Sequence, residues 1–341
     1  MKIAVVCGGL SNERDVSITS GTCVARALRE RGHKVVLVDL FYGYSGSYSD
    51  PSELFEREQE DMAYSVKEET PDIEKMLADG NGSRIGGNVL EICKAADICF
   101  LALHGEDGEN GKLQATMDIH GIKYTGSSYL GSAIAMNKEI TKIMLRNSGI
   151  PTPEGIVLEK GGEYAEVGFP CVVKPCSGGS SVGTSMVKDK SEYAAALELA
   201  FKYEDHVLVE RFIKGRELTV GVMGDKAMPV IEIIPKQGWY DYKNKYQAGL
   251  TEEICPAPIS AEDTDRVQRL AERVKTALMV DVYCRADFLM DSASGELYCL
   301  EANTLPGMTP TSLIPQMGRE QGLDFGEVCE KIIELSMEKY K

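Results

Sequence analysis

RADFLMDSASGELYCLEANTLPGMT, residues 285–309, decides how the C-terminal part of the chain folds. Two runs rich in apolar residues flank a turn at Ser294–Gly295, and this pattern predicts a β-hairpin. Successive strand residues point to opposite faces, so Glu301 and Asn303 share one face, and pairing across the hairpin brings Asp287 opposite them. The sequence therefore places two carboxylates and an amide together on one face of a sheet.

The residues that share this face suit a divalent cation. Carboxylate and amide oxygens are hard ligands, and three of them leave positions on Mg²⁺ for water and nucleotide phosphate. Acids on a hairpin are more often simply solvated, so the hairpin alone leaves both interpretations open. Arg285 lies on the same face as Asp287 and favours the metal site, because a cation beside the metal would stabilise a developing anion.

A second candidate site is a glycine-rich loop between two expected strands, in KPCSGGSSVGTSMV, residues 174–187. Glycines let backbone N–H groups turn toward an anion, and the hydroxyls of Ser180 and Ser181 add donors. With Lys174 at the end of the preceding strand, the loop is suited to folding over phosphates. It is not a Walker A loop, because the lysine precedes the glycines and no helix follows. A plain hairpin loop is the alternative.

The N-terminal third predicts a parallel, doubly wound α/β sheet. Strand-like runs cover residues 3–7, 35–40 and 98–103, and helical patterns cover 17–31 and the stretch from 112. Open sheets of this kind bind ligands at the carboxyl ends of their strands, where Glu13 and His104 fall. Glu13 would hold a ligand ammonium there, or would be an acid favoured by the helix dipole. The turn GGLSNERD is not GxGxxG, which disfavours NAD.

The rest of the chain mixes helices with strands, as in an α+β arrangement. We expect helices at 137–148, 191–203 and 261–278, two further helices at the C-terminus, and strands within 170–187 and at 207–213. These patterns divide the chain into three domains at 1–126, 127–213 and 214–341. The first domain contains an insertion at about 41–88, whose residues 41–80 carry eleven acids and three bases. We expect this insertion to be a solvated segment with one or two short helices.

Composition limits the class of protein. The formal net charge of −16 disfavours binding to nucleic acid or to anionic lipid. No run approaches the 18 apolar residues of a membrane span. The ten cysteines include no CxxC pair, and several interrupt strand-like runs, which indicates reduced thiols in a cytoplasmic protein.

Taken together, these segments resemble the D-alanine–D-alanine ligases of the ATP-grasp superfamily. The resemblance covers nearly the whole chain apart from the insertion. It rests on GGLSNERDVSITSG, LHGEDGENGKLQ, NKEITK, KPCSGGSSVG, VERFIKGRELTV, YDYKNKY, RADFL and LEANTLPGMTPTSL, which occur in the order found in the family. It implies an N-terminal substrate domain at 1–126, a central ATP-grasp domain at 127–213 and a C-terminal catalytic ATP-grasp domain at 214–341.

The resemblance also implies roles for individual residues. ATP would be bound by Lys138 and Lys174 on its phosphates, Ser181 in the covering loop, Glu210 on the adenine amino group, Phe212 and Ile213 at the adenine slot, and Glu217 on the ribose. Two Mg²⁺ ions, with Mn²⁺ as a substitute, would be held by Asp287, Glu301 and Asn303. The donor D-alanine would meet Glu13 and His104, the acceptor D-alanine would meet Ser312 and Leu313, and the reaction would be served by Ser180, Tyr246, Lys245, Arg285 and the Gly307 N–H.

The resemblance therefore implies ligation of two D-alanines through an acyl phosphate, for peptidoglycan synthesis, by a homodimer. Two other hypotheses stay open at this point. In the first, the chain is a ligase that joins D-alanine to another acceptor, such as D-lactate or D-serine, or that makes a dipeptide for a specialised pathway. The second, a non-catalytic nucleotide-binding protein, is disfavoured, because every expected metal carboxylate and phosphate lysine is present.

Overall fold

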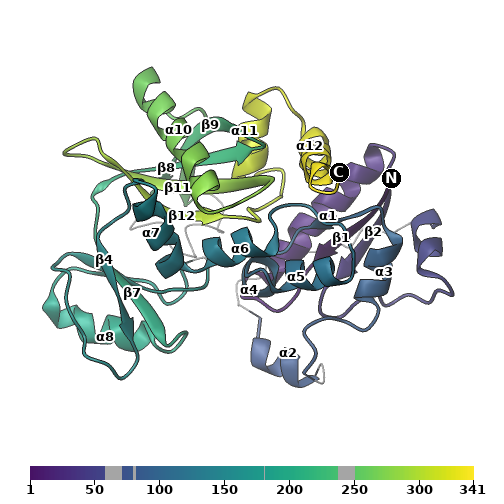
Figure 1. Ribbon diagram of the computed structural model, residues 1–341, viewed down its shortest axis with the longest axis horizontal. Helices are drawn as coiled ribbons and strands as arrows, with labels where there is room; N and C mark the ends of the chain where they lie inside the picture. The colour runs from purple at the N-terminus through teal and green to yellow at the C-terminus, as the bar shows by residue number, and fades with distance from the viewer. Residues whose placement is uncertain (58–70, 80–81, 180, 237–249) are drawn as a thin grey trace.

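The computed structural model describes residues 1–57, 71–79, 82–179, 181–236 and 250–341 of the chain. Its strands form three sheets; in Figure 1 the N-terminal sheet lies at the right, and the other two lie at the left, one above the other. Both termini lie at the end formed by the N-terminal sheet (Figure 1).

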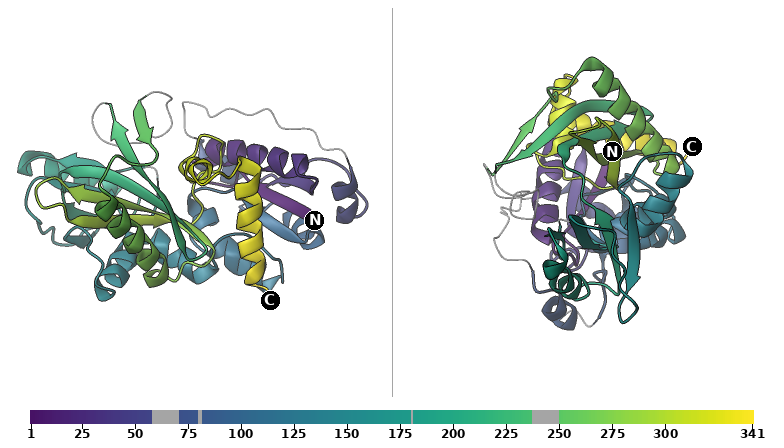
Figure 2. Two further views of the ribbon diagram at one scale, coloured as in Figure 1. Left: turned by 90° about the horizontal axis from the view of Figure 1, so that it is seen from above. Right: turned by 90° about the vertical axis from the view of Figure 1, so that its left-hand side faces the viewer.

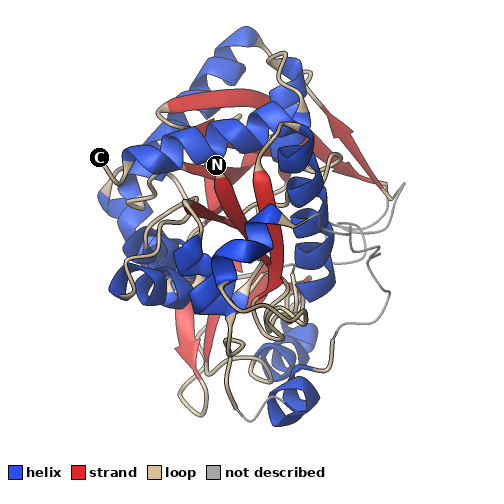
Figure 3. Cartoon of the chain, turned by 90° about the vertical axis from the view of Figure 1, so that its right-hand side faces the viewer, coloured by secondary structure: helices blue, strands red, loops and turns tan. Residues whose placement is uncertain are grey.

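The N-terminal sheet is parallel, as the sequence predicts, with the order β2-β1-β3. Its strands are β1 (Lys2–Cys7), β2 (Lys34–Asp39) and β3 (Ile98–Leu101). One face packs against α1 (Arg14–Glu30) and the C-terminal helix α12 (Phe325–Glu338). The other face packs against η1 (Pro51–Glu56), α3 (Val89–Ala95) and α5 (Lys112–Ile119), so helices flank both faces (Figure 3). The strand runs are almost wholly apolar because both faces are buried.

The insertion is less solvated than the sequence suggests. Its described part holds the two short helices expected, η1 and α2 (Ile73–Asp79). However, Leu54 and Phe55 of η1 are buried in the core beside β2, at 0% and 3% exposure. The expectation of a solvated segment is therefore wrong for η1, because one pair of apolar side chains is enough to dock a short 3-10 helix.

The two remaining sheets are antiparallel. The central sheet has the order β4-β7-β5-β6, and the C-terminal sheet has the order β10-β9-β8-β11-β12. The central strands are β4 (Gly155–Glu159), β5 (Cys171–Pro175), β6 (Ser185–Val187) and β7 (His206–Arg211), packed on α8 (Lys190–Ala200). The C-terminal strands are β8 (Gly215–Met223), β9 (Lys226–Pro235), β10 (Thr251–Ile254), β11 (Tyr283–Asp291) and β12 (Leu297–Asn303).

Helices cover the C-terminal sheet on both sides. The long helix α10 (Ala261–Ala277) packs on the apolar face of β8 and β11, together with α6 (Tyr129–Met136) and α7 (Lys138–Asn147). On the opposite face, α11 (Leu313–Glu320) packs on β9. From α11 the chain continues into α12, which lies beside α1 (Figure 2). The first and last parts of the chain thus share one core.

The strands of each sheet fall within one of the three predicted domain ranges. Packing does not follow the same boundaries, because α6 and α7 join the core of the C-terminal sheet and α12 joins that of the N-terminal sheet. The domain division stays a prediction. All ten cysteines are free thiols, as expected. Among the helices of the described ranges, none is long and apolar enough to cross a membrane.

Candidate functional site

The predicted hairpin is β11 and β12, and its register places the three predicted metal ligands as expected. Asp287 pairs with Glu301, and Arg285 pairs with Asn303, so the four side chains share one face of the sheet. The buried Asp287 carboxylate accepts hydrogen bonds from Thr219 Oγ1 at 2.6 Å and Asn303 Nδ2 at 2.9 Å. Sequence reasoning missed Thr219, although it lies in the quoted segment VERFIKGRELTV.

Arg285 forms a two-pronged ion pair with the same carboxylate. Its Nε and Nη2 atoms each lie 2.9 Å from an Asp287 oxygen. A paired guanidinium has a fixed plane, so Arg285 is oriented before any ligand arrives. The strand spacing of two residues is what allows both side chains to meet on one face.

The donor set on this face fits a hard cation that shares its coordination with a ligand. Asp287 and Glu301 supply carboxylate oxygens, and Asn303, which donates through Nδ2, retains its amide oxygen as an acceptor. Within the described ranges, no group of three or more His, Cys, Asp or Glu side chains is arranged to hold a metal ion. Phosphate oxygens and water would therefore have to complete the shell.

Lys138 connects this hairpin to the glycine-rich loop. It is the first residue of α7, and its Nζ donates to the Gly178 carbonyl at 2.7 Å and lies 3.9 Å from Glu301 Oε2. The cap residue Asn137 accepts from Ile140 N at 3.1 Å, which fixes the start of the helix. A cation therefore sits between a loop suited to phosphates and a carboxylate suited to a metal.

A buried charge cluster lies behind Lys138. The Glu210 carboxylate on β7 pairs with Lys174 on β5 and with Lys142 on α7, and all three side chains are buried. Lys142 Nζ lies 2.7 Å from Glu210 and 3.0 Å from Thr152 Oγ1. Burial raises the pKa of Glu210, but the two ammonium groups lower it more, so the carboxyl stays ionised with its pKa below the usual range.

Sequence reasoning missed Lys142, although it lies in the quoted segment NKEITK. Lys142 lies four residues after Lys138, and this spacing places both lysines on one face of α7. The spacing could have identified Lys142 as a second candidate cation. Because both Glu210 oxygens already accept from lysines, an adenine contact would have to share one of them. The predicted contact of Glu210 with adenine and that of Lys174 with phosphate stay predictions.

The N-terminal turn meets the glycine-rich loop at Glu13. A Cβ at Gly179 would lie 2.9 Å from Glu13 Oε2, and one at Gly105 would lie 3.0 Å from the same oxygen. Glycine at both positions lets two backbones approach one carboxylate. Ser11 closes the arrangement, since its Oγ donates to the His104 carbonyl at 2.7 Å and accepts from Glu13 N at 3.2 Å.

His104 is buried beside this turn as a neutral imidazole. Its Nδ1 faces the Leu305 carbonyl at 3.0 Å, and its Nε2 faces Ser20 Oγ at 3.0 Å. A carbonyl only accepts, so Nδ1 carries the proton and Nε2 accepts from Ser20. Burial lowers the pKa of His104, more than the nearby Glu13 raises it. His104 therefore donates to the segment that follows the hairpin.

Glu109 is a second residue that sequence reasoning missed. It ends the short helix α4 (Glu106–Glu109), and its carboxylate accepts from Gly105 N at 2.7 Å and from Leu305 N at 3.2 Å. Burial, and then the charge of Glu13, raise the pKa of Glu109 to about 7. Nothing in the segment HGEDGENG predicts that Glu109 accepts hydrogen bonds from both Gly105 and the distant Leu305.

The predicted acceptor residues lie where the chain enters α11. Ser312 occupies the N-cap position of this helix without a side-chain capping hydrogen bond, and its Oγ lies 2.8 Å from Thr309 Oγ1 and 3.0 Å from where a Cβ at Gly307 would lie. Leu313 is buried in the core shared with α12. Ser312 and Gly307 are thus neighbours, as the predicted site requires.

Comparisons with known proteins identify the family of this chain. Two family models match the chain, "D-ala D-ala ligase N-terminus" over residues 2–127 and "D-ala D-ala ligase C-terminus" over residues 144–334. The chain belongs to the D-alanine–D-alanine ligase family. The expectation from the sequence motifs is confirmed, and so is the mixed α/β fold of that family.

Individual relatives extend over the full length of the chain. A D-alanine–D-alanine ligase from Pediococcus pentosaceus is 44% identical over 98% of this chain and 97% of its own. The solved D-alanine–D-alanine ligase of Bacillus anthracis complexed with ATP is 32% identical, covers 99% of this chain and 98% of its own, and has a TM-score of 0.75. The VanG D-Ala:D-Ser ligase of Enterococcus faecalis is 28% identical, with 98% and 99% coverage and a TM-score of 0.75.

The other residues that the family resemblance singles out are placed as follows. Ser181 has a left-handed backbone with φ of 58° in the glycine-rich loop. Phe212 and Ile213 follow β7, and Glu217 lies on β8, on the same face as Asp287 by register. Ser180, Lys245 and Tyr246 lie outside the described residues.

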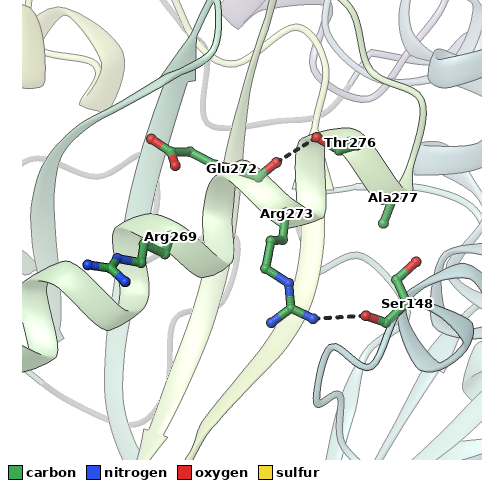
Figure 4. A pocket seen from close by; sticks show the side chains of 6 residues that line it. All are labelled: Ser148, Arg269, Glu272, Arg273, Thr276 and Ala277. Carbon is green, nitrogen blue, oxygen red and sulfur yellow. Dashed lines mark hydrogen bonds between the residues drawn. The ribbon is translucent and has the colours of Figure 1, made fainter.

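A groove on the outer side of this ligase is separate from the site. It lies over α10 and the end of α7 (Figure 4). Its arginines are already paired, Arg273 with the Ser148 carbonyl at 2.8 Å and Arg269 with Asp265 at 2.9 Å. Since α10 covers the face of the sheet opposite Asp287, the groove does not reach the predicted metal ligands.

Proposed function

We propose that this protein is an ATP-dependent ligase that joins two D-alanines to D-alanyl-D-alanine for peptidoglycan precursor synthesis. The family matches support the activity. The observation that carries the proposal at the level of the site is the contact of Lys138 with both the Gly178 carbonyl and the Glu301 carboxylate. The Lys138 ammonium thereby contacts both the loop suited to phosphates and the hairpin suited to a metal ion.

The reaction needs activation of the donor, because a carboxylate does not condense with an amine at neutral pH. ATP phosphorylates the donor D-alanine to an acyl phosphate, and the amine of the acceptor D-alanine then displaces phosphate. Lys138 and Lys174 hold the ATP phosphates and neutralise their charge, and Ser181 adds a donor from the covering loop. Lys245, which lies outside the described residues, would neutralise the phosphate in transfer. Phe212, Ile213, Glu210 and Glu217 hold the adenosine.

The metal assignment rests on the same face of the hairpin. Asp287, Glu301 and Asn303 would hold two Mg²⁺ ions, with Mn²⁺ as a substitute. When bound, such ions screen the charge of the transferring phosphoryl group. Arg285, oriented by Asp287, and the Gly307 N–H receive the oxyanion that forms when the acceptor attacks, and one such donor is typically worth about 3 kcal/mol.

Different residues would hold the two D-alanines. Glu13 anchors the donor ammonium, and His104, fixed as the Nδ1–H tautomer, keeps the wall of that pocket in place. Ser312 receives the acceptor carboxylate, and Leu313 contacts its methyl group. Ser180 and Tyr246 would complete a hydrogen-bonded chain with Glu13 that fixes the covering loop.

D-Serine and D-lactate are the alternative acceptors, and the likeness to a D-Ala:D-Ser ligase supports keeping them in the test. We also propose a cytoplasmic homodimer. Free thiols at all ten cysteines suit a reducing compartment. The dimer comes from the family resemblance alone.

The decisive experiment incubates the protein with ATP, Mg²⁺ and D-alanine and follows phosphate release and dipeptide formation. Release that depends on D-alanine, with D-alanyl-D-alanine as the product, supports the proposal. Release that occurs only with D-serine or D-lactate present beside D-alanine would assign another acceptor. No release with any of them would contradict ligase activity.

A further inference from the structure

The end of the acidic insertion, Ser83–Asn88, is tied firmly to the N-terminal sheet. Gly86 N donates to the Leu40 carbonyl at 2.8 Å, directly after β2. Asn88 accepts from Tyr44 N at 3.0 Å and donates to the Tyr44 carbonyl at 2.7 Å. Ile85 packs against the core beside β2. The segment is therefore a fixed platform for the side chain of Arg84.

Arg84 reaches from this platform to the short helix α4. Its Nε donates to Asp107 in an ion pair. The side chain of Asp107 is 11% exposed, whereas that of Arg84 is 40% exposed. A nearly buried carboxylate needs a cation or several hydrogen-bond donors, and Arg84 supplies the cation from the solvent side.

Helix α4 carries an excess of negative charge that Arg84 offsets. Three of its four residues are acids, Glu106, Asp107 and Glu109, and the nearest base along the chain is Lys112. Partial burial and the charge of Asp107 raise the pKa of Glu106, while Arg84 and Lys112 lower it. Glu106 also has a φ of 38°, a strained value for a residue with a side chain. This turn needs an external contact to keep its shape.

The same turn forms one wall of the proposed donor pocket. Glu109 accepts from the N–H groups of Gly105 and Leu305, and Gly105 faces the Glu13 carboxylate. A shift of α4 by a fraction of an ångström therefore moves Gly105 relative to Glu13. Asp107, which contacts Arg84 of the insertion, lies in the same turn as Gly105 and Glu109, which border the pocket.

We propose that Arg84 is a positioning residue for the donor D-alanine, and that residues 83–88 at the end of the insertion thereby form part of the donor side of the site. Arg84 touches no substrate and acts through Asp107 and α4. This inference rests on the proposed function, since it assumes that Glu13 and Gly105 border the donor pocket.

The test compares Arg84→Ala with the wild type in steady-state assays that resolve the KM values for the two D-alanines. We expect the KM for the donor to rise about tenfold, a coupling of ordinary size for contacting residues, while the acceptor KM, the ATP KM and kcat change less than about twofold. Arg84→Lys keeps the charge and should restore the donor KM in large part. Arg57→Ala is the matched control, because Arg57 lies in the same insertion but contacts Glu53 and the Ser47 carbonyl instead of α4.

A double-mutant cycle isolates the pair. Asp107→Asn should raise the donor KM as Arg84→Ala does, and the double variant should be no worse than either single variant. An unchanged donor KM in folded Arg84→Ala would overturn the inference, as would an equal rise in Arg57→Ala.

A measurement that does not depend on catalysis tests the positioning role of Arg84 separately from the proposed function. Hydrogen exchange at the amides of Gly105 and Leu305 should be faster in Arg84→Ala than in the wild type and in Arg57→Ala. A wild type that forms no ADP with D-alanine would contradict the proposed function alone. Unchanged exchange at both amides would contradict the positioning role whatever the substrate.

Discussion

The ammonium of Lys142 and the carboxylate of Glu210 lie 2.7 Å apart in the interior between α7 and β7. Lys142 is 2% exposed and Glu210 is 3% exposed, so neither charge is screened by water. Lys174 shares the same carboxylate, which makes the cluster a buried cation–anion–cation triad with a net positive charge. Such a triad suits a place where phosphates are to bind.

Replacing Lys142 by methionine should destabilise the fold. The change leaves Glu210 buried with one cation instead of two, and we expect a loss of about 3 kcal/mol in the free energy of unfolding. Urea unfolding measures it. Lys190→Met is the control, because Lys190 forms an ion pair of 2.8 Å with Glu166 on the surface, where the loss should stay below about 0.5 kcal/mol. Equal losses in the two variants would show that burial does not matter here.

Replacing Glu301 by glutamine should abolish turnover and leave the fold intact. The side chain keeps its shape but loses the charge that the proposed metal site needs, so we expect kcat to fall at least about 100-fold. The measurement is D-alanine-dependent ADP formation at limiting Mg²⁺, with circular dichroism to check folding. Glu296→Gln, at the turn of the same hairpin, should keep the wild-type rate. Wild-type turnover in Glu301→Gln would remove this residue from the site.

The raised pKa of Glu109 predicts a pH-dependent stability. Burial raises it from 4.5 to about 7, in an environment that also contains Glu13, Arg285 and Tyr283. Between these pH values the folded protein holds a proton that the unfolded chain releases, so the free energy of unfolding should fall as the pH rises through this window.

Glu109→Gln removes this titration. The fall in stability between pH 4.5 and 7 should therefore be smaller in the variant, by roughly 2 kcal/mol for a carboxyl at the edge of the interior. Chemical denaturation at several pH values measures the difference. Parallel pH profiles for the two proteins would contradict the assigned pKa.

Acceptor choice should depend on the hydroxyl of Tyr246, which lies outside the described residues. An amine acceptor must arrive neutral, whereas lactate offers a hydroxyl, so the local hydrogen-bond network decides which nucleophile is competent. We expect the wild type to make mainly D-alanyl-D-alanine, and Tyr246→Phe to gain ligation of D-lactate. Product chromatography with equal D-alanine and D-lactate near neutral pH checks both expectations. An unchanged product ratio in Tyr246→Phe would show that the hydroxyl does not set the choice.

Local patterns were sufficient to predict the parallel N-terminal sheet and the register of the hairpin that carries the candidate metal ligands. The alternation around Asp287 and Glu301 gave the hairpin register, because strand pairing obeys a period of two. The parallel sheet followed from the apolar runs of β1, β2 and β3, which are buried on both faces.

Contacts between residues that lie far apart along the chain could not be predicted from the sequence. Nothing in the patterns joins Glu109 to Leu305 or Arg84 to Asp107, because each contact depends on how whole elements dock. The docking of Leu54 and Phe55 in η1 was missed for a different reason. Two apolar residues in an acidic segment are too few to form a periodic pattern, yet they are enough to fill a gap beside β2.

The position of Leu305 has a consequence for how the two ligands influence each other. Its carbonyl accepts from His104, its N–H donates to Glu109, and it lies two residues after Asn303 of the hairpin. A ligand that moves this residue from either side changes the free energy of binding on the other side. Thermodynamic linkage then requires symmetry, so the factor by which nucleotide tightens D-alanine binding equals the factor by which D-alanine tightens nucleotide binding. Any coupling between the two ligands that passes through Leu305 would therefore be reciprocal.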